Sequence, residues 1–279
     1  MSEIINPSDL VALYKEKECV IIDARAGADA RRRHEDLHLT SARFVDVETE
    51  LAQKTDNAAQ GGRHPLPSVV YFARILGSLG IKPESHVVVY DDKNASNAAA
   101  RFWWMLKAVG HKNVQVINGG FQGAIAAGFP TQSGLVSFQI SDGYPAQGWL
   151  LPTAEIEAVA QAALDSDHVV IDVRDSERYK GIFEPIDLIA GHIAGAINIP
   201  FTENLDFDGF FLPSEQLKEK YELAVGTFKP ENIIVHCGSG VTACHTLLAF
   251  AHAGLPIPKL YVGSWSEWSR NDRAIGQSV

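Results

Sequence analysis

The chain alternates short apolar runs with longer amphipathic stretches. The apolar runs are rich in Val and Ile and occupy residues 19–22, 87–90, 168–171 and 233–235. Runs of four to eight such residues bounded by polar residues are typical of buried strands. Apolar positions with helical spacing cover residues 67–79 before one strand and 95–109 after it. Pro7 and Pro152 are typical helix starts, so further helices are expected there.

This alternation predicts an α/β fold in which mainly parallel sheets are flanked by helices. The second half also repeats the first in the same order. Asp23 ends one apolar run and Asp172 ends its counterpart, while Asp91 corresponds to Cys237 and Gly119 to Gly263. The spacing between partners drifts by only a few positions, as loop insertions would cause. A repeat of this length indicates a duplicated domain rather than a solenoid unit of about 20–50 residues.

The two predicted domains are separated by a stretch with little periodicity. Residues 131–150 are rich in Gly, Pro, Ser and Gln, which favours a linker. We therefore place the first domain at residues 1–130 and the second at residues 151–279.

The predicted strand ends carry the candidate chemistry. Parallel sheets place their sites in loops at the carboxyl ends of strands. In the second half that place belongs to Cys237, and in the first half to Asp91. Only the second domain thus has a thiol there, and the first is expected to keep the fold while serving as a wall or a regulator.

The stretch after Cys237 favours nucleophilic sulfur chemistry. Gly238 and Gly240 permit backbone conformations that let several N–H groups converge on one point. Ser239 and Thr242 add hydroxyl groups, and Thr242 also suits a helix N-cap. Such a loop stabilises a thiolate and equally an anionic persulfide. The predicted site comprises Cys237, Gly238, Ser239, Gly240, Val241 and Thr242.

Other interpretations of this stretch are weaker. A free cysteine is usually a buried, unreactive thiol, but this interpretation does not explain the glycines and hydroxyl groups of the loop that follows. A cysteine phosphatase loop ends in an arginine, whereas this one reaches Ala243. Residues 238–243 fit the dinucleotide-binding pattern G-x-G-x-x-G/A. That pattern needs an acidic residue further on to bind the ribose hydroxyl, and residues 256–260 contain none. A metal site is not predicted, because the candidate ligands lack the close pairs of a zinc site. Those candidates are His236, Cys237, Cys244, His245 and His252.

Composition excludes several other function classes. The net charge of −10 argues against binding to nucleic acid or to an anionic membrane surface. Three cysteines form too sparse a set for a secreted disulfide framework. No apolar stretch approaches the roughly 20 residues of a membrane span, and the start of the sequence lacks a signal-peptide pattern. A cytoplasmic location is therefore expected.

Taken together, these motifs resemble those of the tandem-domain rhodanese sulfurtransferases. Residues 237–242 are similar to the active loop of the 3-mercaptopyruvate sulfurtransferases, whereas thiosulfate sulfurtransferases usually carry Arg-Lys at the positions of Gly238 and Ser239. The other matching stretches are residues 103–105, 118–121, 172–174, 178–179, 191–196 and 263–268.

The resemblance implies two rhodanese domains, of which the second is catalytic. Sulfur from 3-mercaptopyruvate or thiosulfate, a small anionic donor, would be captured on Cys237 as a persulfide. It would then pass to cyanide, a thiol or thioredoxin, without a cofactor. Thiosulfate sulfurtransferase proper, or a rhodanese module that carries persulfide sulfur or only binds partners, remains the alternative.

The resemblance also implies roles for residues outside the loop. Arg178 matches the arginine that holds the substrate anion, and Arg63 and His64 lie in a first-domain segment expected to reach the site. Glu48 takes the position of an aspartate expected near Ser239, and we assign it a catalytic role with that serine.

Three further positions qualify this assignment. Ile186 stands where a second substrate arginine is usual, which keeps thiosulfate open as the donor. Arg174, two residues after Asp172, is expected to make a structural ion pair at the domain edge. Cys244 is expected to be a buried helix residue, with a resolving thiol as the alternative.

Overall fold

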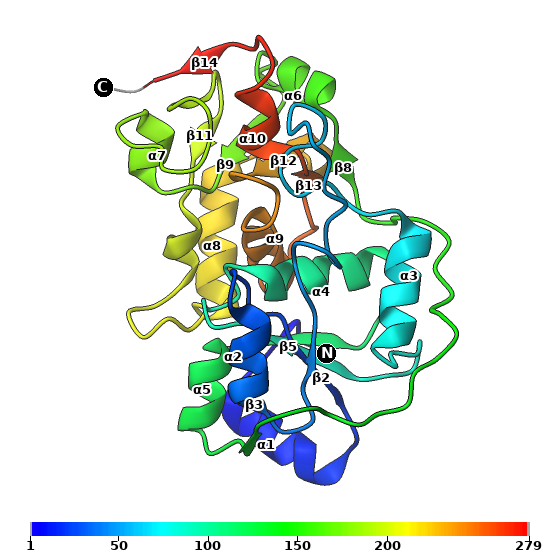
Figure 1. Cartoon of the computed structure of the whole chain (residues 1–279). Helices are drawn as coiled ribbons and strands as arrows, with labels where there is room; N and C mark the ends of the chain where they lie inside the picture. Colours follow the sequence, from blue (N-terminus) through cyan, green and yellow to red (C-terminus); the bar gives the residue numbers. More distant parts are fainter. Residues whose placement is uncertain (1, 278–279) are drawn as a thin grey trace. The chain divides into compact units, whose positions relative to one another are not determined.

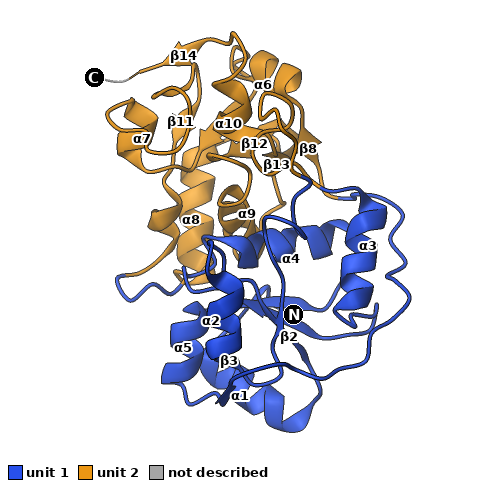
Figure 2. Cartoon of the chain, in the orientation of Figure 1, with its two compact units in different colours: residues 1–53, 67–150, 207–210 blue, residues 54–66, 151–206, 211–279 orange. Residues whose placement is uncertain are grey.

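A computed structural model describes residues 2–277 of the chain (Figure 1). These residues form two compact units (Figure 2). The first unit contains residues up to 53, 67–150 and 207–210, and the second contains residues 54–66, 151–206 and those from 211 onward. Residues 54–66 therefore belong to the second unit although they come from the first half of the sequence. This segment brings Arg63 and His64 to the unit that contains Cys237.

The first unit is built on a parallel sheet with the strand order β1-β6-β5-β2-β4. The strands are β1 (Ile4–Ile5), β2 (Val20–Asp23), β4 (Arg43–Phe44), β5 (Val87–Tyr90) and β6 (Val114–Ile117). A separate antiparallel pair joins β3 (His38–Leu39) to β7 (Thr131–Gln132). The helices are α1 (Pro7–Glu16), α2 (Ala30–Asp36), α3 (Val69–Ser78), α4 (Ala98–Ala108) and α5 (Gly120–Ala126). The residues of β2, β5 and β6 are all buried, because helices cover both faces of a parallel sheet.

The second unit repeats this sheet with the order β11-β9-β12-β13-β8. Its strands are β8 (Thr153–Ala154), β9 (Val169–Asp172), β11 (Ile197–Asn198), β12 (Ile233–His236) and β13 (Lys259–Tyr261). An antiparallel pair joins β10 (His192–Ile193) to β14 (Ile275–Gly276). The helices are α6 (Ile156–Ala162), α7 (Ser176–Lys180), α8 (Ser214–Val225), α9 (Ala243–His252) and α10 (Ser264–Trp268), with 3-10 turns η1 (Phe201–Asn204) and η2 (Pro230–Asn232).

The matching strand orders confirm the predicted α/β class, the mainly parallel sheets and the duplication. In each unit the middle strand of the sheet, β5 or β12, pairs with the strand that ends in an acid, β2 or β9. The carboxyl end of the middle strand carries Asp91 in one unit and Cys237 in the other.

Two predicted helix starts were wrong by a few residues. Thr153 is not helical but belongs to β8, because the Leu260 N–H donates to the Pro152 carbonyl and draws this segment into the sheet. Helix α4 begins at Ala98 rather than at residue 95, since the Asp91 carboxylate binds the backbone N–H groups of the intervening loop.

None of the helices within residues 2–277 combines the length and the apolar character that crossing a bilayer requires.

Candidate active site

Cys237 lies directly after β12 at the centre of the second unit's sheet and is 2% exposed. Its backbone N–H donates to Ser264 Oγ at 3.2 Å, and its carbonyl accepts from the Trp265 N–H at 3.0 Å. Both partners begin helix α10. The backbone of the cysteine is therefore held on both sides of its Cα, which fixes the direction of the Cα–Cβ bond.

The loop after Cys237 is fixed by close backbone packing. The Gly238 carbonyl accepts from the Ser266 N–H at 2.8 Å. Gly240 has a φ of +75°, and a Cβ there would lie 2.4 Å from the Val262 carbonyl oxygen. Thr242 occupies the N-cap position of α9, and the Cys244 thiol in the first turn donates to the Gly240 carbonyl at 3.4 Å. Only glycine fits position 240, as the sequence pattern indicates.

Two arginines from different segments lie against this loop. A Cβ built on Gly238 would lie 3.3 Å from Nη2 of Arg63 and 3.5 Å from Nη2 of Arg178. Both guanidinium groups therefore lie beside the residue that follows Cys237. Guanidinium groups bind carboxylates and other oxyanions through pairs of hydrogen bonds, so this arrangement is suited to an anionic ligand.

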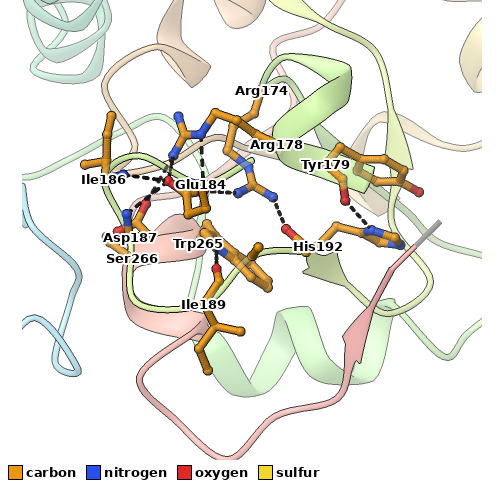
Figure 3. Close-up of polar contacts among 12 residues, drawn as sticks. Arg174, Arg178, Tyr179, Glu184, Ile186, Asp187, Ile189, His192, Trp265 and Ser266 are labelled. Atoms are coloured by element: carbon orange, nitrogen blue, oxygen red, sulfur yellow. Dashed lines mark hydrogen bonds and ion pairs between the residues drawn. The ribbon is translucent and has the colours of Figure 1, made fainter. Parts of the chain in front are cut away.

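Glu184 holds Arg178 in place (Figure 3). Its carboxylate accepts from Nη2 of Arg178 at 2.7 Å and from Nη1 of Arg174 at 3.1 Å. It also accepts from the backbone N–H groups of Ile186 and Asp187, each at 3.0 Å. Burial raises the pKa of Glu184, but the hydrogen bonds from Arg178 and the backbone outweigh it and leave the pKa below its ordinary value. Glu184 is thus an ionised anchor for both arginines.

Asp187 is a site residue that sequence reasoning missed. Its side chain is fully buried and forms ion pairs with Arg63, with Arg178 at 3.4 Å and with Arg270 at 3.4 Å. Its only signal in the sequence was its place directly after Ile186, the position at which the family usually carries a second substrate arginine. Ile186 itself is 57% exposed, so no side chain there replaces the missing arginine beside Arg63 and Arg178.

His64 lies beside the loop serine. Its Nδ1 is 2.8 Å from Ser239 Oγ, and Ser239 is buried. The segment that carries His64 is tied down by the Arg63 N–H, which donates to Ser266 Oγ at 3.1 Å, and by the Gly61 N–H, which donates to Glu267 Oε1 at 2.7 Å. Ser239 therefore has a histidine partner within the second unit.

Glu48 belongs to the first unit, where its backbone N–H donates to Asp46 Oδ1 at 2.7 Å. Its pairing with Ser239 stays a prediction.

Arg174 makes the structural ion pair expected of it. Its guanidinium binds Asp172 through two nitrogens, the closer at 2.6 Å, and both side chains are buried. The same guanidinium donates to the Gly191 carbonyl at 2.7 Å and lies over the Trp265 ring. Burial raises the pKa of Asp172, but His236 and Arg174 more than offset this and hold it below its ordinary value. Arg174 thereby links β9 to the segment that contains Glu184.

In the first unit the equivalent loop, which follows β5, surrounds the carboxylate of Asp91. The buried Asp91 carboxylate accepts from the backbone N–H groups of Lys93, Ala95, Asn97 and Ala99 at 2.8, 2.9, 3.2 and 3.1 Å. Burial raises the pKa of Asp91 to about 6, although these hydrogen bonds act in the opposite direction. A loop in this position thus surrounds a carboxylate with N–H groups, the environment that a thiolate or persulfide on Cys237 requires.

No group of three or more His, Cys, Asp or Glu side chains within residues 2–277 is arranged to hold a metal ion.

Two α/β units with the same strand order, one of which carries a buried cysteine in a loop faced by arginines, define a duplicated thiol-enzyme scaffold. The Rhodanese-like domain family matches this chain twice, at residues 6–127 and 157–271. The chain belongs to the rhodanese family, and it is an enzyme of the sulfurtransferase class.

Its relatives support this placement. The chain is 36% identical to a probable 3-mercaptopyruvate sulfurtransferase of Pseudomonas aeruginosa, over 98% of this chain and 96% of that protein. It is also 36% identical to a putative thiosulfate sulfurtransferase of Mycobacterium tuberculosis, over 99% and 97%. A solved structure, the 3-mercaptopyruvate sulfurtransferase from Leishmania major, superposes with a TM-score of 0.83 at 30% identity, covering 96% of this chain and 74% of that one.

Proposed function

We propose that this enzyme takes sulfur from 3-mercaptopyruvate, holds it as the sulfane sulfur of a persulfide on Cys237, and passes it to a thiophilic acceptor. The observation that carries the proposal is the position of two guanidinium groups, from Arg63 and Arg178, beside Gly238 in the Cys237 loop. An anionic donor bound there would present its sulfur to a buried thiol at the end of a strand. A reduced Cys237 suits the cytoplasmic location that the sequence predicts.

In the first step the Cys237 thiolate attacks the donor sulfur. A sulfur–sulfur bond forms and the carbon–sulfur bond of the donor breaks, so that its electron pair passes to the pyruvate enolate. The enolate then takes up a proton and leaves as pyruvate. The Arg178 guanidinium holds the donor carboxylate, and the loop N–H groups stabilise the sulfur anion.

We assign the proton transfer to Ser239 and His64. The serine hydroxyl and the His64 ring are within hydrogen-bond distance at 2.8 Å, so a proton can pass through Ser239 Oγ to the departing group. We assign Glu48 the role of a further acceptor for Ser239. In the second step a nucleophilic acceptor, cyanide, a small thiol or thioredoxin, attacks the outer sulfur of the persulfide and releases the Cys237 thiolate.

Thiosulfate is the alternative donor. It is favoured by Ile186, which stands where a second substrate arginine is expected, and by a relative named for thiosulfate. The loop residues Gly238 and Ser239 favour 3-mercaptopyruvate instead, because they offer no extra cation for a dianion.

Steady-state kinetics with each donor test the proposal, using cyanide as the acceptor and Cys237→Ser as the control. A covalent intermediate predicts double-displacement kinetics, and kcat/KM should be higher for 3-mercaptopyruvate than for thiosulfate. Hydrolysis of a phosphate monoester at a comparable rate, or sulfur transfer that survives Cys237→Ser, would refute it.

A further inference from the structure

The buried carboxylate of Asp187 has no role in the sulfur-transfer steps, yet it forms ion pairs with Arg63 and Arg178, which lie beside the Cys237 loop. We propose that Asp187 is a specificity-determining residue, which limits the donor pocket to a singly charged anion and so disfavours a dianion such as thiosulfate. This inference rests on the proposed function, because it concerns the donor that the same site accepts.

The charges joined by ion pairs around Asp187 nearly cancel. Within the described part of the chain, we define the arginine cluster as the Arg, Asp and Glu side chains linked to Asp187, directly or in sequence, by these ion pairs. Its members are Arg63, Arg174, Arg178 and Arg270 with Asp172, Glu184 and Asp187. Four guanidinium groups and three carboxylates leave a surplus of one positive charge. A monoanion completes this balance, whereas a dianion leaves one negative charge uncompensated.

The geometry makes Asp187 the acid whose charge acts most directly on a bound donor. It is the carboxylate shared by Arg63 and Arg178, the two side chains that reach Gly238. An anion bound on the other edge of either guanidinium would lie on the order of 6 Å from the Asp187 carboxylate, the span of two charge-assisted hydrogen bonds and the group between them. At that separation each negative charge on the donor is repelled by Asp187.

The two candidate donors differ by one charge. The 3-mercaptopyruvate thiol has an ordinary pKa of about 8.5, so the molecule is mainly a monoanion at neutral pH, while thiosulfate is a dianion. Asp187 therefore repels two negative charges on thiosulfate but only one on 3-mercaptopyruvate. With the effective dielectric of a partly buried site, one charge at this distance changes affinity by roughly tenfold to a hundredfold.

A purely structural role for Asp187 predicts a different outcome. If Asp187 only kept the arginines in position, its loss would weaken the binding of every anion to a similar degree. The ratio of dianion affinity to monoanion affinity therefore separates the two roles. A cluster charge changed in the opposite direction should also move this ratio in the opposite direction.

The experiment measures the dissociation constants of pyruvate and thiosulfate by calorimetry in Cys237→Ser protein, where no sulfur is transferred. Adding Asp187→Asn should raise the affinity for thiosulfate relative to pyruvate by about tenfold or more. Adding Arg270→Gln, which removes a positive charge from a side chain that is 25% exposed, should lower this ratio. The matched control is Glu222→Gln, an exposed acid on α8 with the same change in net charge, and it should leave the ratio unchanged.

An unchanged ratio in Asp187→Asn, or a fall in Arg270→Gln no larger than in the control, overturns the inference. If Asp187→Asn does not fold, the Arg270→Gln result decides alone. Absence of any anion binding also overturns it. Failure of the proposed function is recognised separately, as absence of sulfur transfer by the unmodified enzyme with both donors.

Discussion

Replacing Gly240 by alanine should strongly reduce the activity of the enzyme although it adds a single methyl group. The loop at this position has a φ of +75°, which costs a residue with a β-carbon about 1–2 kcal/mol. The new Cβ would also lie 2.4 Å from the Val262 carbonyl oxygen, and backbone atoms cannot yield as the end of a flexible side chain does. The loop must therefore shift away from the strand by a sizeable fraction of an ångström.

Such a shift would misplace the loop N–H groups that we propose stabilise the Cys237 sulfur. A displacement of about 1 Å in a catalytic group commonly costs on the order of 100-fold in rate, so we expect kcat/KM to fall by about that factor. The free energy of unfolding should fall by about 1–3 kcal/mol, from the backbone strain and the lost packing.

Gly238→Ala is the matched control, because it adds the same methyl group two residues earlier. Its Cβ would meet only side-chain ends, Nη2 of Arg63 at 3.3 Å and Nη2 of Arg178 at 3.5 Å. The fold should be retained and the main effect should be a higher KM for the donor. Donor kinetics and thermal unfolding of both variants make the comparison. Equal and small effects of the two substitutions on kcat would refute the argument that the shape of the loop backbone sets the rate.

Three further predictions follow from the site and from its counterpart in the first unit. Arg178→Lys keeps the charge but loses the paired hydrogen bonds, so the KM for the donor should rise about tenfold or more in steady-state assays, with kcat less affected; an unchanged KM would remove Arg178 from donor binding. Ser239→Ala removes the partner of His64 and should lower kcat more than it raises KM, and a pH–rate profile unaltered by the substitution would argue against proton transfer through Ser239. Burial raises the pKa of Asp91 to about 6 in the folded chain, against 3.8 ordinarily, so folding favours its protonated form. Relative to Asp91→Asn, the free energy of unfolding should therefore be greatest near pH 4 and fall by about 3 kcal/mol as the pH rises through 6. A flat difference between the two proteins in urea titrations at pH 4, 5, 6 and 7 would contradict this.

Much of the fold could be predicted from local sequence. Apolar runs of Val and Ile favour buried parallel strands, and the recurrence of Asp23 as Asp172 indicated the duplication. The same logic located Cys237, because a strand end followed by Gly-Ser-Gly constrains the backbone directly. Helix starts were less certain, since they depend on distant partners such as the Leu260 N–H that draws Pro152 into the sheet.

The electrostatics of the site could not be predicted in the same way. Asp187 and Arg270 are far apart in the sequence, and neither carries a motif, so their ion pair appears only when the segments fold together. Family patterns named Arg178 but not the acids that hold it. The charge balance of the arginine cluster is thus a property of tertiary structure that a motif does not encode.

In the proposed reaction Cys237 carries the sulfur between donor and acceptor. Intact-mass analysis of the enzyme treated with 3-mercaptopyruvate and no acceptor shows whether it does. We predict a gain of about 32 Da, one sulfur atom, that disappears on adding cyanide and is absent from Cys237→Ser. Turnover without any such gain, or the same gain in Cys237→Ser, would contradict the account.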